Sequence, residues 1–465
     1  MQLGDILEDT RLDLLTSSIE ISSVEIDSRD CHEGALFFAL PGEQSHGALF
    51  AVEAVANGAV AVVASERVEV PVPVVQVPAS QVRALMSHAS ATITGHPESR
   101  MNIVGVTGTN GKTSVANMVG ALARALHWNG AALGTLTGER TTPAPPELYR
   151  SLRRVEDTMD PSLARTVVAL EVSSHALDQH RVEGLRFAVA AFTNLSHDHL
   201  DYHGTMESYF LAKAKLFTPE HSQRAVIWCD DPYGQRLAEA TQLGVTAVRR
   251  VNATNVTTSL AGTTFFWRNH LINTPLVGGY NVDNALMAMA IVSSLGGSDA
   301  DVARALGDVH GVRGRFEVIQ GRDFSIVIDF AHTPDGLRRL LLDVRDLSPS
   351  ARVITVFGCG GDRDRAKRSE MGAVASLLSD VTIVTTDNPR SEAPDDIIDA
   401  IMSGVLPGES VVRLRDRREA IGEAFALAGR GDVVVIAGKG HETTQTIGDV
   451  VVQFDDAAVA RELLK

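Results

Sequence analysis

Cysteine is scarce in this chain, which has three in 465 residues, at Cys31, Cys229 and Cys359. An odd number at such wide spacing favours neither a disulfide framework nor a zinc knuckle. No apolar run reaches the ~18 residues that span a bilayer, and the N-terminus lacks a signal-peptide pattern. No dense Lys/Arg block occurs and the net charge is −16, which argues against a nucleic-acid partner, although local basic pockets can still bind small anions. These absences favour a cytoplasmic enzyme with no membrane insertion.

The length and composition allow several packed domains. At 465 residues the usual size prior gives about three. A hydrophobic content of 44% with 22% charged residues is ordinary for a globular protein with a large core. Strand and helix patterns alternate along most of the chain, which favours an α/β class. We expect a monomer with three domains, over residues 1–98, 99–316 and 317–465.

The most informative stretch is residues 103–126, which reads as a short buried strand, a glycine-rich turn and an amphipathic helix. Such a turn closes backbone N–H groups on a phosphate, and the helix N-terminus adds partial positive charge. Lys112 can reach the outer phosphates and Thr113 can ligate Mg²⁺. The general motif wants a glycine at Val106, whereas here it stands at Gly105. The turn predicts a nucleoside triphosphate site formed by Gly108, Thr109, Asn110, Gly111, Lys112 and Thr113.

A candidate metal ligand follows the next buried strand. Residues 166–170 form an apolar run that ends in Glu171. A carboxylate at the carboxyl end of a parallel strand lies beside the phosphate loop, where ligands collect. Glu171 is therefore a candidate Mg²⁺ ligand, and its plain alternative is a capping carboxylate.

The loop after the expected strand at 187–192 is rich in imidazoles and carboxylates. His197, His199 and Asp201 have the spacing of zinc ligands. Tyr202, however, displaces the next histidine from the place that a dinuclear zinc site needs, and a phosphate loop lies upstream. Mg²⁺ held by hard oxygens and at most one imidazole is therefore favoured.

Four other features of the central region are expected to bear on the site. A turn at 141–143 carries two threonine hydroxyls that could accept a substrate, and a helix is expected over 209–217, where lysines are normally solvated. Residues 281–284 open a helix expected over 285–295, and they suit either an N-cap or an adenine contact. Two glycines within 311–316 indicate a hinge.

The first 98 residues carry no phosphate loop. A strand and turn at 34–42, followed by a helix and a strand within 51–63, predict a small α/β domain. Residues 66–80 are punctuated by proline and read as a sheet edge. Ser28 and Arg29 taken alone would cap and pair locally.

From residue 317 onward a second parallel sheet is expected, with strands at 324–330, 353–357, 382–386 and 433–437. Each strand leads into a polar loop, and the carboxyl ends of parallel strands share one edge of the sheet. The four loops therefore predict a site for a zwitterionic or doubly charged molecule. They are residues 329–332, 360–365, 387–390 and 438–442.

The motifs as a set resemble those of the Mur ligases. GTNGKT, EVSSH, NLSHDHLDYHG, NVDN, GRFE, DFAHTPDGL, GCGGDRD, DNPR and GKGHE occur in that family's order over essentially the whole chain. Within the family the chain resembles the UDP-N-acetylmuramoyl-tripeptide synthetases, which add the third residue of the peptidoglycan stem peptide. The resemblance implies an N-terminal UDP-binding α/β domain, a central ATPase domain and a C-terminal Rossmann-like amino-acid-binding domain.

The resemblance also implies a role for individual residues. Lys213 matches a lysine that the family carries as a carbamate, Lys215 does not align with it, and His332 lies in the same motif as Asp329. Catalytic or metal-binding roles fall on Lys112, Thr113, Glu171, His199 and Lys213. ATP contacts fall on Gly108, Thr109, Asn110, Gly111, Ser114, Asn284, Arg315 and Asp329. Contacts to the UDP-muramoyl-dipeptide fall on Ser28, Thr141, Thr142, Ser173, Gln179 and Arg181. Contacts to the incoming amino acid are implied for Arg363, Asp387, Asn388, Arg390, Gly438 and Glu442.

The implied reaction uses ATP and Mg²⁺ to convert the dipeptide's free carboxyl to an acyl phosphate, which the amine of an amino acid then attacks. The DNPR form accompanies meso-diaminopimelate in the family, and a lysine-adding ligase is the alternative. A folylpolyglutamate-type ligase, or a phosphate-loop switch or kinase, also stays open. Two departures stand out: Ala393 where relatives usually carry aspartate, and Trp228-Cys229 in place of a smaller polar pair.

Overall fold

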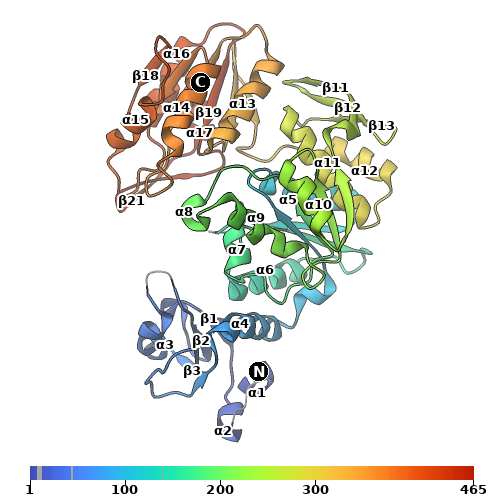
Figure 1. Cartoon of the computed structure of the whole chain (residues 1–465), viewed down its shortest axis with the longest axis vertical. Coiled ribbons are helices and arrows are strands. Elements are labelled where there is room, and N and C mark those ends of the chain that lie inside the picture. The colour runs from blue at the N-terminus through green and yellow to red at the C-terminus, as the bar shows by residue number, and fades with distance from the viewer. Residues whose placement is uncertain (8–12, 43–44, 139) are drawn as a thin grey trace.

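The protein is seen here as a computed structural model that describes residues 1–7, 13–42, 45–138 and 140–465. Three α/β parts follow one another along the chain and are coloured in sequence order in Figure 1. The first and last parts lie toward opposite ends of the long axis, and the central part lies between them (Figure 1). Among the described residues no helix is long and apolar enough to cross a membrane.

The N-terminal part is built on a parallel four-stranded sheet in the order β1-β2-β3-β4. Its second strand is buried at every position, because apolar clusters cover both faces of the sheet. The proline-punctuated stretch supplies the edge strand, as the sequence predicts. The strands are β1 (Ser23–Glu25), β2 (Ala35–Ala39), β3 (Ala59–Ala64) and β4 (Val74–Gln76). The helices are α1 (Leu3–Ile6), α2 (Leu14–Ser17), α3 (Ala51–Ala56) and α4 (Ala79–Thr94).

The central part holds a parallel six-stranded sheet in the order β10-β9-β8-β5-β7-β6. Strand β5 precedes the phosphate loop and lies between β7 and β8. The chain moves to one side of β5 for β6 and β7 and to the other side for β8, so the strand order reverses there. Ligands bind at such reversal points. The strands are β5 (Asn102–Thr107), β6 (Asn129–Leu133), β7 (Thr166–Glu171), β8 (Val189–Phe192), β9 (Arg224–Trp228) and β10 (Gly244–Val248).

Helices cover both faces of the central sheet. Helices α5 and α11 pack together in one apolar cluster, and α6 and α9 contribute to a second one. The helix expected over 209–217 ends earlier, at Ala214, and a 3-10 turn (Lys215–Phe217) completes it. The helices are α5 (Lys112–Ala125), α6 (Pro145–Asp157), α7 (Ser174–Asp178), α8 (Leu200–His203), α9 (Met206–Ala214), α10 (Pro232–Ala240), α11 (Gly279–Ser294) and α12 (Asp299–Ala305).

The predicted start of α11 is wrong. The helix begins at Gly279, and its N-cap is Gly278, whose φ of 94° suits glycine. Asn281 therefore lies inside the first turn, where its side chain donates to the Val277 carbonyl over 2.7 Å. Asn284 lies a turn further in and lines a pocket between the central and C-terminal parts.

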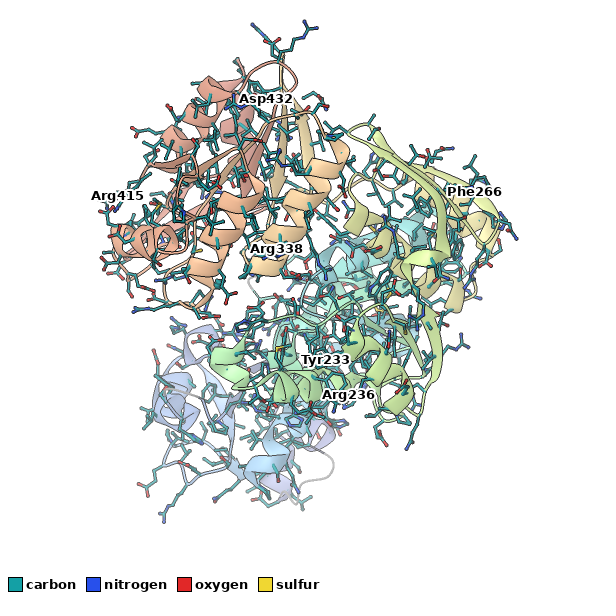
Figure 2. The ribbon with its side chains drawn as sticks, turned by 45° about the horizontal axis from the view of Figure 1, so that its top comes forward. Tyr233, Arg236, Phe266, Arg338, Arg415 and Asp432 are labelled. Atoms are coloured by element: carbon teal, nitrogen blue, oxygen red, sulfur yellow. The ribbon has the colours of Figure 1, made fainter. Side chains whose placement is uncertain are left out.

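An antiparallel three-stranded sheet in the order β11-β12-β13 was not predicted. Its inner side chains, among them Phe265 and Trp267, join the cluster around α5 and α11. Phe266, one residue between them, lies on the outer side of the sheet, as alternation requires (Figure 2). The strands are β11 (Ala253–Ser259), β12 (Gly262–Trp267) and β13 (His270–Thr274).

The C-terminal part is a six-stranded sheet in the order β14-β15-β19-β16-β17-β18. The prediction of a parallel sheet is confirmed for five strands, whereas β14 runs antiparallel to β15. The strands are β14 (Glu317–Gln320), β15 (Ser325–Asp329), β16 (Val353–Phe357), β17 (Val381–Val384), β18 (Val411–Arg413) and β19 (Val433–Ala437), with a hairpin of β20 (Thr444–Ile447) and β21 (Val450–Gln453). The helices are α13 (Pro334–Leu347), α14 (Lys367–Leu378), α15 (Pro394–Met402), α16 (Arg417–Leu427) and α17 (Asp456–Leu463).

A fully buried ion pair joins two of these helices, α16 and α17. Arg417 on α16 donates to both carboxylate oxygens of Asp456 on α17, at 2.8 and 2.7 Å, and also to the Ala437 carbonyl at 3.0 Å. Both side chains are 0% exposed. Removing either partner therefore strands a charge in the core.

We predict that Asp456→Ala destabilises the C-terminal sheet by about 3–5 kcal/mol, because Arg417 keeps its charge without a counterion. The matched control is the double variant Arg417→Met/Asp456→Leu, which removes both charges and should recover most of the loss. Hydrogen exchange of the β16 and β19 amides measures the loss of stability in each variant. Equal exchange in wild type and Asp456→Ala would contradict the prediction.

Candidate active site

The phosphate loop is held rigidly at the end of β5. Gly108 and Gly111 have φ of 147° and 86°, and a Cβ on Gly108 would come within 1.9 Å of Thr193 Oγ1. Asn110 is fixed from the next strand end, because its N–H donates to Asn194 Oδ1 at 2.9 Å and its carbonyl accepts from Thr193 Oγ1 at 2.6 Å. The loop geometry is therefore set by β8 as well as by its own glycines.

Two lysines from distant segments converge on one carbonyl of the loop. The Lys112 and Lys213 Nζ atoms donate to the Gly108 oxygen at 3.0 and 2.9 Å. Lys213 is 1% exposed and lies 4.6 Å above the Tyr209 ring. Burial lowers the pKa of Lys213 well below its usual value, and the neighbouring Lys112 lowers it further. The solvated surface expected for lysines on this helix is therefore wrong for Lys213.

Glu171 faces the first helical turn from the end of β7. Its Oε2 accepts from the Thr113 hydroxyl at 2.8 Å, and its Oε1 accepts from the Thr135 N–H at 2.9 Å. Ser173, not Glu171, caps the following helix α7. Arg315 donates to the Thr113 hydroxyl at 3.3 Å, so this corner also receives a cation from the hinge segment. No sequence motif predicted a role for Thr135 in the site.

His199 lies at the other side of the loop, among aromatic rings. Its Nε2 is 3.4 Å from Asp198 Oδ2, and its ring meets His175 edge-on with centroids 5.0 Å apart. Burial lowers the pKa of His199 to about 4, against the opposing effect of Asp198. Within the described residues, no three or more His, Cys, Asp or Glu side chains are grouped to hold a metal ion.

Five residues assigned to the muramoyl-dipeptide by resemblance come together beside Glu171. The Thr142 hydroxyl donates to the Glu171 carbonyl at 2.8 Å and accepts from the Ser173 N–H at 3.0 Å. Arg181 donates to the Thr142 carbonyl at 3.1 Å and to Gln179 Oε1 at 2.6 Å. The fifth, Thr141, accepts from the Thr135 hydroxyl at 3.2 Å.

Ser28 lies outside this group, in the N-terminal part. Its hydroxyl donates to Glu53 Oε2 at 2.7 Å, so the local cap expected from sequence is replaced by a contact 25 residues away. Arg29 does pair locally, with Asp27.

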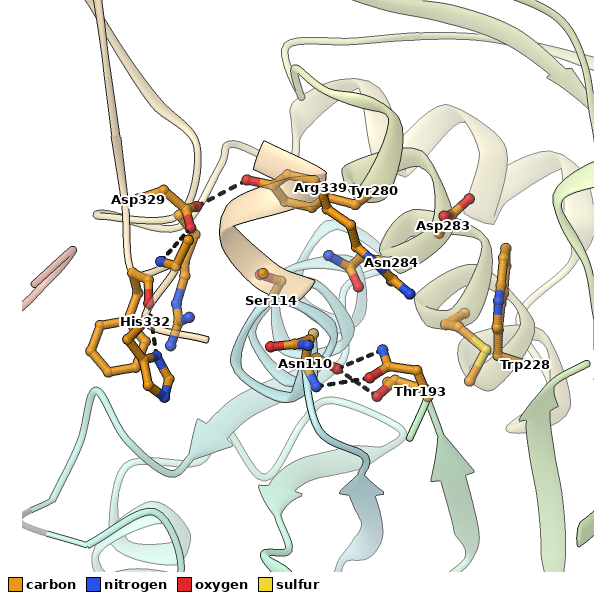
Figure 3. Close-up of a pocket in the computed structure, with 17 residues that line it drawn as sticks. Asn110, Ser114, Thr193, Trp228, Tyr280, Asp283, Asn284, Asp329, His332 and Arg339 are labelled. Carbon is orange, nitrogen blue, oxygen red and sulfur yellow. Dashed lines mark hydrogen bonds between the residues drawn. The ribbon is translucent and has the colours of Figure 1, made fainter. Parts of the chain in front are cut away.

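A pocket opens between the central and C-terminal parts, with about 770 Å³ of empty space that is partly open to solvent (Figure 3). It is lined by the predicted Asn110, Gly111, Ser114, Asn284, Arg315 and Asp329. Arg315 stacks its guanidinium 4.3 Å from the Phe330 ring centroid, and its buried Nε has no hydrogen-bond partner among the described residues. Trp228 and Tyr280 also line the pocket and were not predicted to do so.

Asp329 ties the two sides of the pocket together. Its carboxylate accepts from the Tyr280 hydroxyl at 2.9 Å, the Phe316 N–H at 2.7 Å and the Ala331 N–H at 2.7 Å. Tyr280 begins helix α11 of the central part, and its N–H donates to Asp343 on α13 at 3.1 Å. Tyr280 of the central part thus contacts two carboxylates of the C-terminal part.

The four polar loops of the C-terminal sheet do converge at one edge. The Gly438 N–H donates to the Asp329 carbonyl at 3.1 Å, and the Gly361 N–H donates to the Asn388 carbonyl at 2.9 Å. Asn388 Nδ2 donates to Glu442 Oε2 at 2.8 Å. Lys439, which the sequence analysis missed, is 0% exposed and donates to Glu442 at 3.2 Å.

Arg390 is held in a left-handed conformation, with φ of 51°. Its Nη1 donates to the Gly361 carbonyl at 2.7 Å, and its backbone pairs with the β20–β21 hairpin. Burial lowers the pKa of Arg390, and the facing Arg363 guanidinium lowers it further. Arg390 is partly buried and Arg363 is exposed, so two neighbouring cationic groups lie at this edge of the sheet.

His332, which lines the pocket between the central and C-terminal parts, is expected to titrate at an unusually low pH. Burial lowers its pKa from 6.5 to about 4, and Lys367 adds to the effect. We predict that its imidazole stays neutral from pH 8 to about 5, as measured by NMR titration. The unfolded chain binds more protons between pH 6.5 and 4, so this histidine makes the fold less stable as the pH falls through that range. A titration midpoint near 6.5 would contradict the prediction, and His332→Asn is the control that assigns the signal.

Comparison with known proteins now gives the family. The Mur ligase family catalytic domain matches residues 20–109, the Mur ligase middle domain 106–292, and the Mur ligase glutamate ligase domain 314–440. A UDP-N-acetylmuramoyl-L-alanyl-D-glutamate–2,6-diaminopimelate ligase of Gloeobacter violaceus is 41% identical, over 100% of this chain and 98% of the relative. The ligase of the same name from Geobacillus kaustophilus is 43% identical, over 96% and 95% of the two chains.

Solved structures agree with this result. A structure of a UDP-N-acetylmuramoyl-L-alanyl-D-glutamate–2,6-diaminopimelate ligase is 31% identical, covers 100% of this chain and 98% of its own, and has a TM-score of 0.68. A Mycobacterium tuberculosis folylpolyglutamate synthase complexed with ADP and AMPPCP is 21% identical, covers 81% of this chain and 94% of its own, and has a TM-score of 0.59, so it shares the fold alone. The chain belongs to the Mur ligase family.

Proposed function

We propose that this chain is an ATP-dependent ligase that joins meso-2,6-diaminopimelate to UDP-N-acetylmuramoyl-L-alanyl-D-glutamate in peptidoglycan precursor synthesis. The relatives of about 40% identity carry that activity in their names. The lysine-adding and folylpolyglutamate alternatives are less well supported, because the named full-length relatives are diaminopimelate ligases and the folylpolyglutamate synthase covers less of the chain. We assign the three parts the bounds 1–98, 99–316 and 317–465.

The residues around the phosphate loop fit ATP and Mg²⁺. Thr113 and Glu171 place two oxygens 2.8 Å apart, and oxygen donors are the ligands that Mg²⁺ prefers. His199, held neutral by burial, is available as a further ligand. Bound Mg²⁺ would neutralise phosphate charge. Lys112 would serve the outer phosphates, and Arg315 offers them a buried N–H that lacks a partner among the described residues.

Lys213 would act as a carbamate in the working enzyme. As an ammonium it would crowd Lys112 on a single carbonyl, and its lowered pKa favours the neutral amine. A neutral amine attacks the carbon of CO₂, forms a C–N bond and loses a proton, which leaves an anionic carbamate. The anion would pair with Lys112 and supply a hard oxygen beside Glu171 and His199.

The reaction would then proceed in two steps between the central and C-terminal parts. The dipeptide carboxylate, placed by the hydroxyl, amide and guanidinium groups beside Glu171, attacks the γ-phosphorus, and ADP leaves with the P–O bond electrons. The amine of the amino acid attacks the acyl carbon, an amide forms, phosphate leaves and the amine loses a proton. Because the nucleotide and amino-acid sites lie on different sheets, rotation about residues 311–316 would bring the reagents together.

The C-terminal loops suit a molecule with two ends of opposite charge. Arg390 and Arg363 present cationic groups to a distal carboxylate, and Glu442 accepts an ammonium. Lysine lacks the distal carboxylate and would leave the guanidinium groups facing each other. Asp387, Asn388 and Gly438 would complete this pocket.

The observation that carries the proposal is a chain of contacts between the two sites: Arg315 donates to the Thr113 hydroxyl, lies in the field of the Asp329 carboxylate, and the Asp329 carbonyl accepts from the Gly438 N–H. The test is phosphate release from ATP in the presence of UDP-muramoyl-dipeptide, meso-diaminopimelate, or both. Release that needs both substrates and yields the tripeptide is expected, and a folded Lys112→Ala protein should release none. Release without the amino acid, or ligation by Lys112→Ala, would overturn the proposal.

Lys213→Ala should lower ligation roughly 100-fold or more, because an anion next to the metals is lost. Acetate or formate should restore part of the rate, whereas Lys213→Arg, which keeps a cation, should stay inactive. The control is Lys215→Ala, an exposed lysine paired with Asp178 at 2.9 Å, which should keep wild-type turnover. Full activity in Lys213→Arg would refute the carbamate, and a ¹³CO₂-labelled NMR signal lost in Lys213→Ala would support it.

Arg390→Ala should lower the preference for meso-diaminopimelate over L-lysine about 10- to 100-fold, since a charge-assisted contact to the distal carboxylate is lost. Initial ligation rates with each amino acid measure this preference. Arg365→Ala is the control, because that residue lies in the same region but is 74% exposed and pairs with Glu392. Equal losses for both amino acids would show that Arg390 only supports the loop through Gly361.

A further inference from the structure

The pocket between the central and C-terminal parts has two chemically different ends. Asp329 and His332 lie at one end and Trp228 at the other, with Asn110 and Ser114 of the phosphate loop between them (Figure 3). Arg315 belongs to the first end and carries a positive charge. Trp228 and Met287 give the second end an apolar wall.

The aromatic ring at the cationic end is already covered. Phe330 has the Arg315 guanidinium 4.3 Å from its centroid, with His332 and His441 at 4.5 and 5.0 Å. Trp228 differs, because among the described residues no ring or cation stacks on its indole. The indole is only partly buried. A flat apolar ligand would therefore find its stacking face at Trp228.

The backbone that carries Trp228 is fixed to the phosphate loop. Trp228 is the last residue of β9, and the turn after it is held by Arg249, which donates to the Cys229 carbonyl at 2.7 Å. Asp231 in that turn accepts from the Leu195 N–H at 3.0 Å. Leu195 follows Asn194, which holds Asn110 of the phosphate loop. The indole and the phosphate site thus belong to one rigid unit.

From this geometry we propose that Trp228 stacks on the purine base of the nucleotide and sets much of its affinity. The inference rests on the proposed use of ATP. A nucleoside triphosphate needs anion-binding groups for its phosphates and a flat apolar region for its base, and the pocket offers the phosphate loop with Arg315 for the first and Trp228 for the second. Base–aromatic stacking is a strong and sequence-tolerant contact. Trp228 is therefore a nucleotide-binding residue that a phosphate-loop motif does not reveal.

The decisive experiment compares ADP with tripolyphosphate, which has the phosphates but no base. Calorimetric titration should show that Trp228→Ala weakens ADP binding about 10-fold, within the range for loss of one base stack, and leaves tripolyphosphate binding unchanged. Trp228→Phe, which keeps an aromatic face, should stay within about threefold of wild type for both probes. Unchanged ADP affinity in Trp228→Ala, or an equal loss for both probes, would overturn the inference.

A spectroscopic control uses Trp128, one of the two other tryptophans of the chain. ADP should quench wild-type tryptophan fluorescence, and the quench should vanish in Trp228→Phe. It should persist in Trp128→Phe, since Trp128 precedes β6 at the opposite edge of the sheet from β9 and β10 and lies against Arg165. A quench that survives in Trp228→Phe would contradict the stack. If wild type failed to ligate at all, the proposed function would fail, whereas ligation with unaltered ADP binding in Trp228→Ala would defeat this inference alone.

Discussion

The arrangement of the site depends on confining positive charge at the end of strand β5. Lys112 and Lys213 approach the same Gly108 carbonyl oxygen from segments a hundred residues apart. Burial lowers the pKa of both amines, and the Lys112 charge lowers that of Lys213 further, so the pair is held together by the fold and not by its own interactions. An anion placed between them is stabilised by both. In the proposed enzyme, phosphate oxygens would pair with Lys112, and a carbamate on Lys213 would remove the repulsion between two neighbouring ammonium groups.

A second constraint is that the phosphate loop and the four polar C-terminal loops lie on different sheets. The contact between the parts is both polar and apolar: Tyr280 reaches two carboxylates, Asp329 collects three hydrogen bonds, and Val277 packs into the apolar cluster of the C-terminal sheet. A Cβ on Gly314 would come within 2.1 Å of the His441 N–H nitrogen, so the hinge passes directly against the GKGHE loop. Rotation at the proposed hinge would therefore shift the C-terminal loops relative to the phosphate loop, as the proposed transfer between separately bound reagents requires.

Much of this could be predicted because the signals are local or follow from strand direction. The phosphate loop is one contiguous motif, and the four C-terminal loops had to meet because carboxyl ends of parallel strands share an edge. The start of α11 was missed because Gly278 supplies the cap through its positive φ and not through a side chain. The β11–β13 sheet and the antiparallel β14 were missed as well, because their pairing depends on distant partners. Thr135 and Tyr280 reach the site by long-range contacts that no local pattern encodes, whereas Lys439 lies in the predicted loop at 438–442 and was not singled out within it.

In the proposed reaction the dipeptide carboxylate itself accepts the γ-phosphoryl group of ATP. Ligation should therefore be run with UDP-muramoyl-dipeptide carrying ¹⁸O in its free carboxylates, and the released phosphate analysed by mass spectrometry or ³¹P NMR. If the carboxylate attacks the γ-phosphorus and the amine then attacks the acyl carbon, each phosphate released carries one ¹⁸O atom from the peptide. Phosphate without ¹⁸O, formed together with the amide product, would contradict the account.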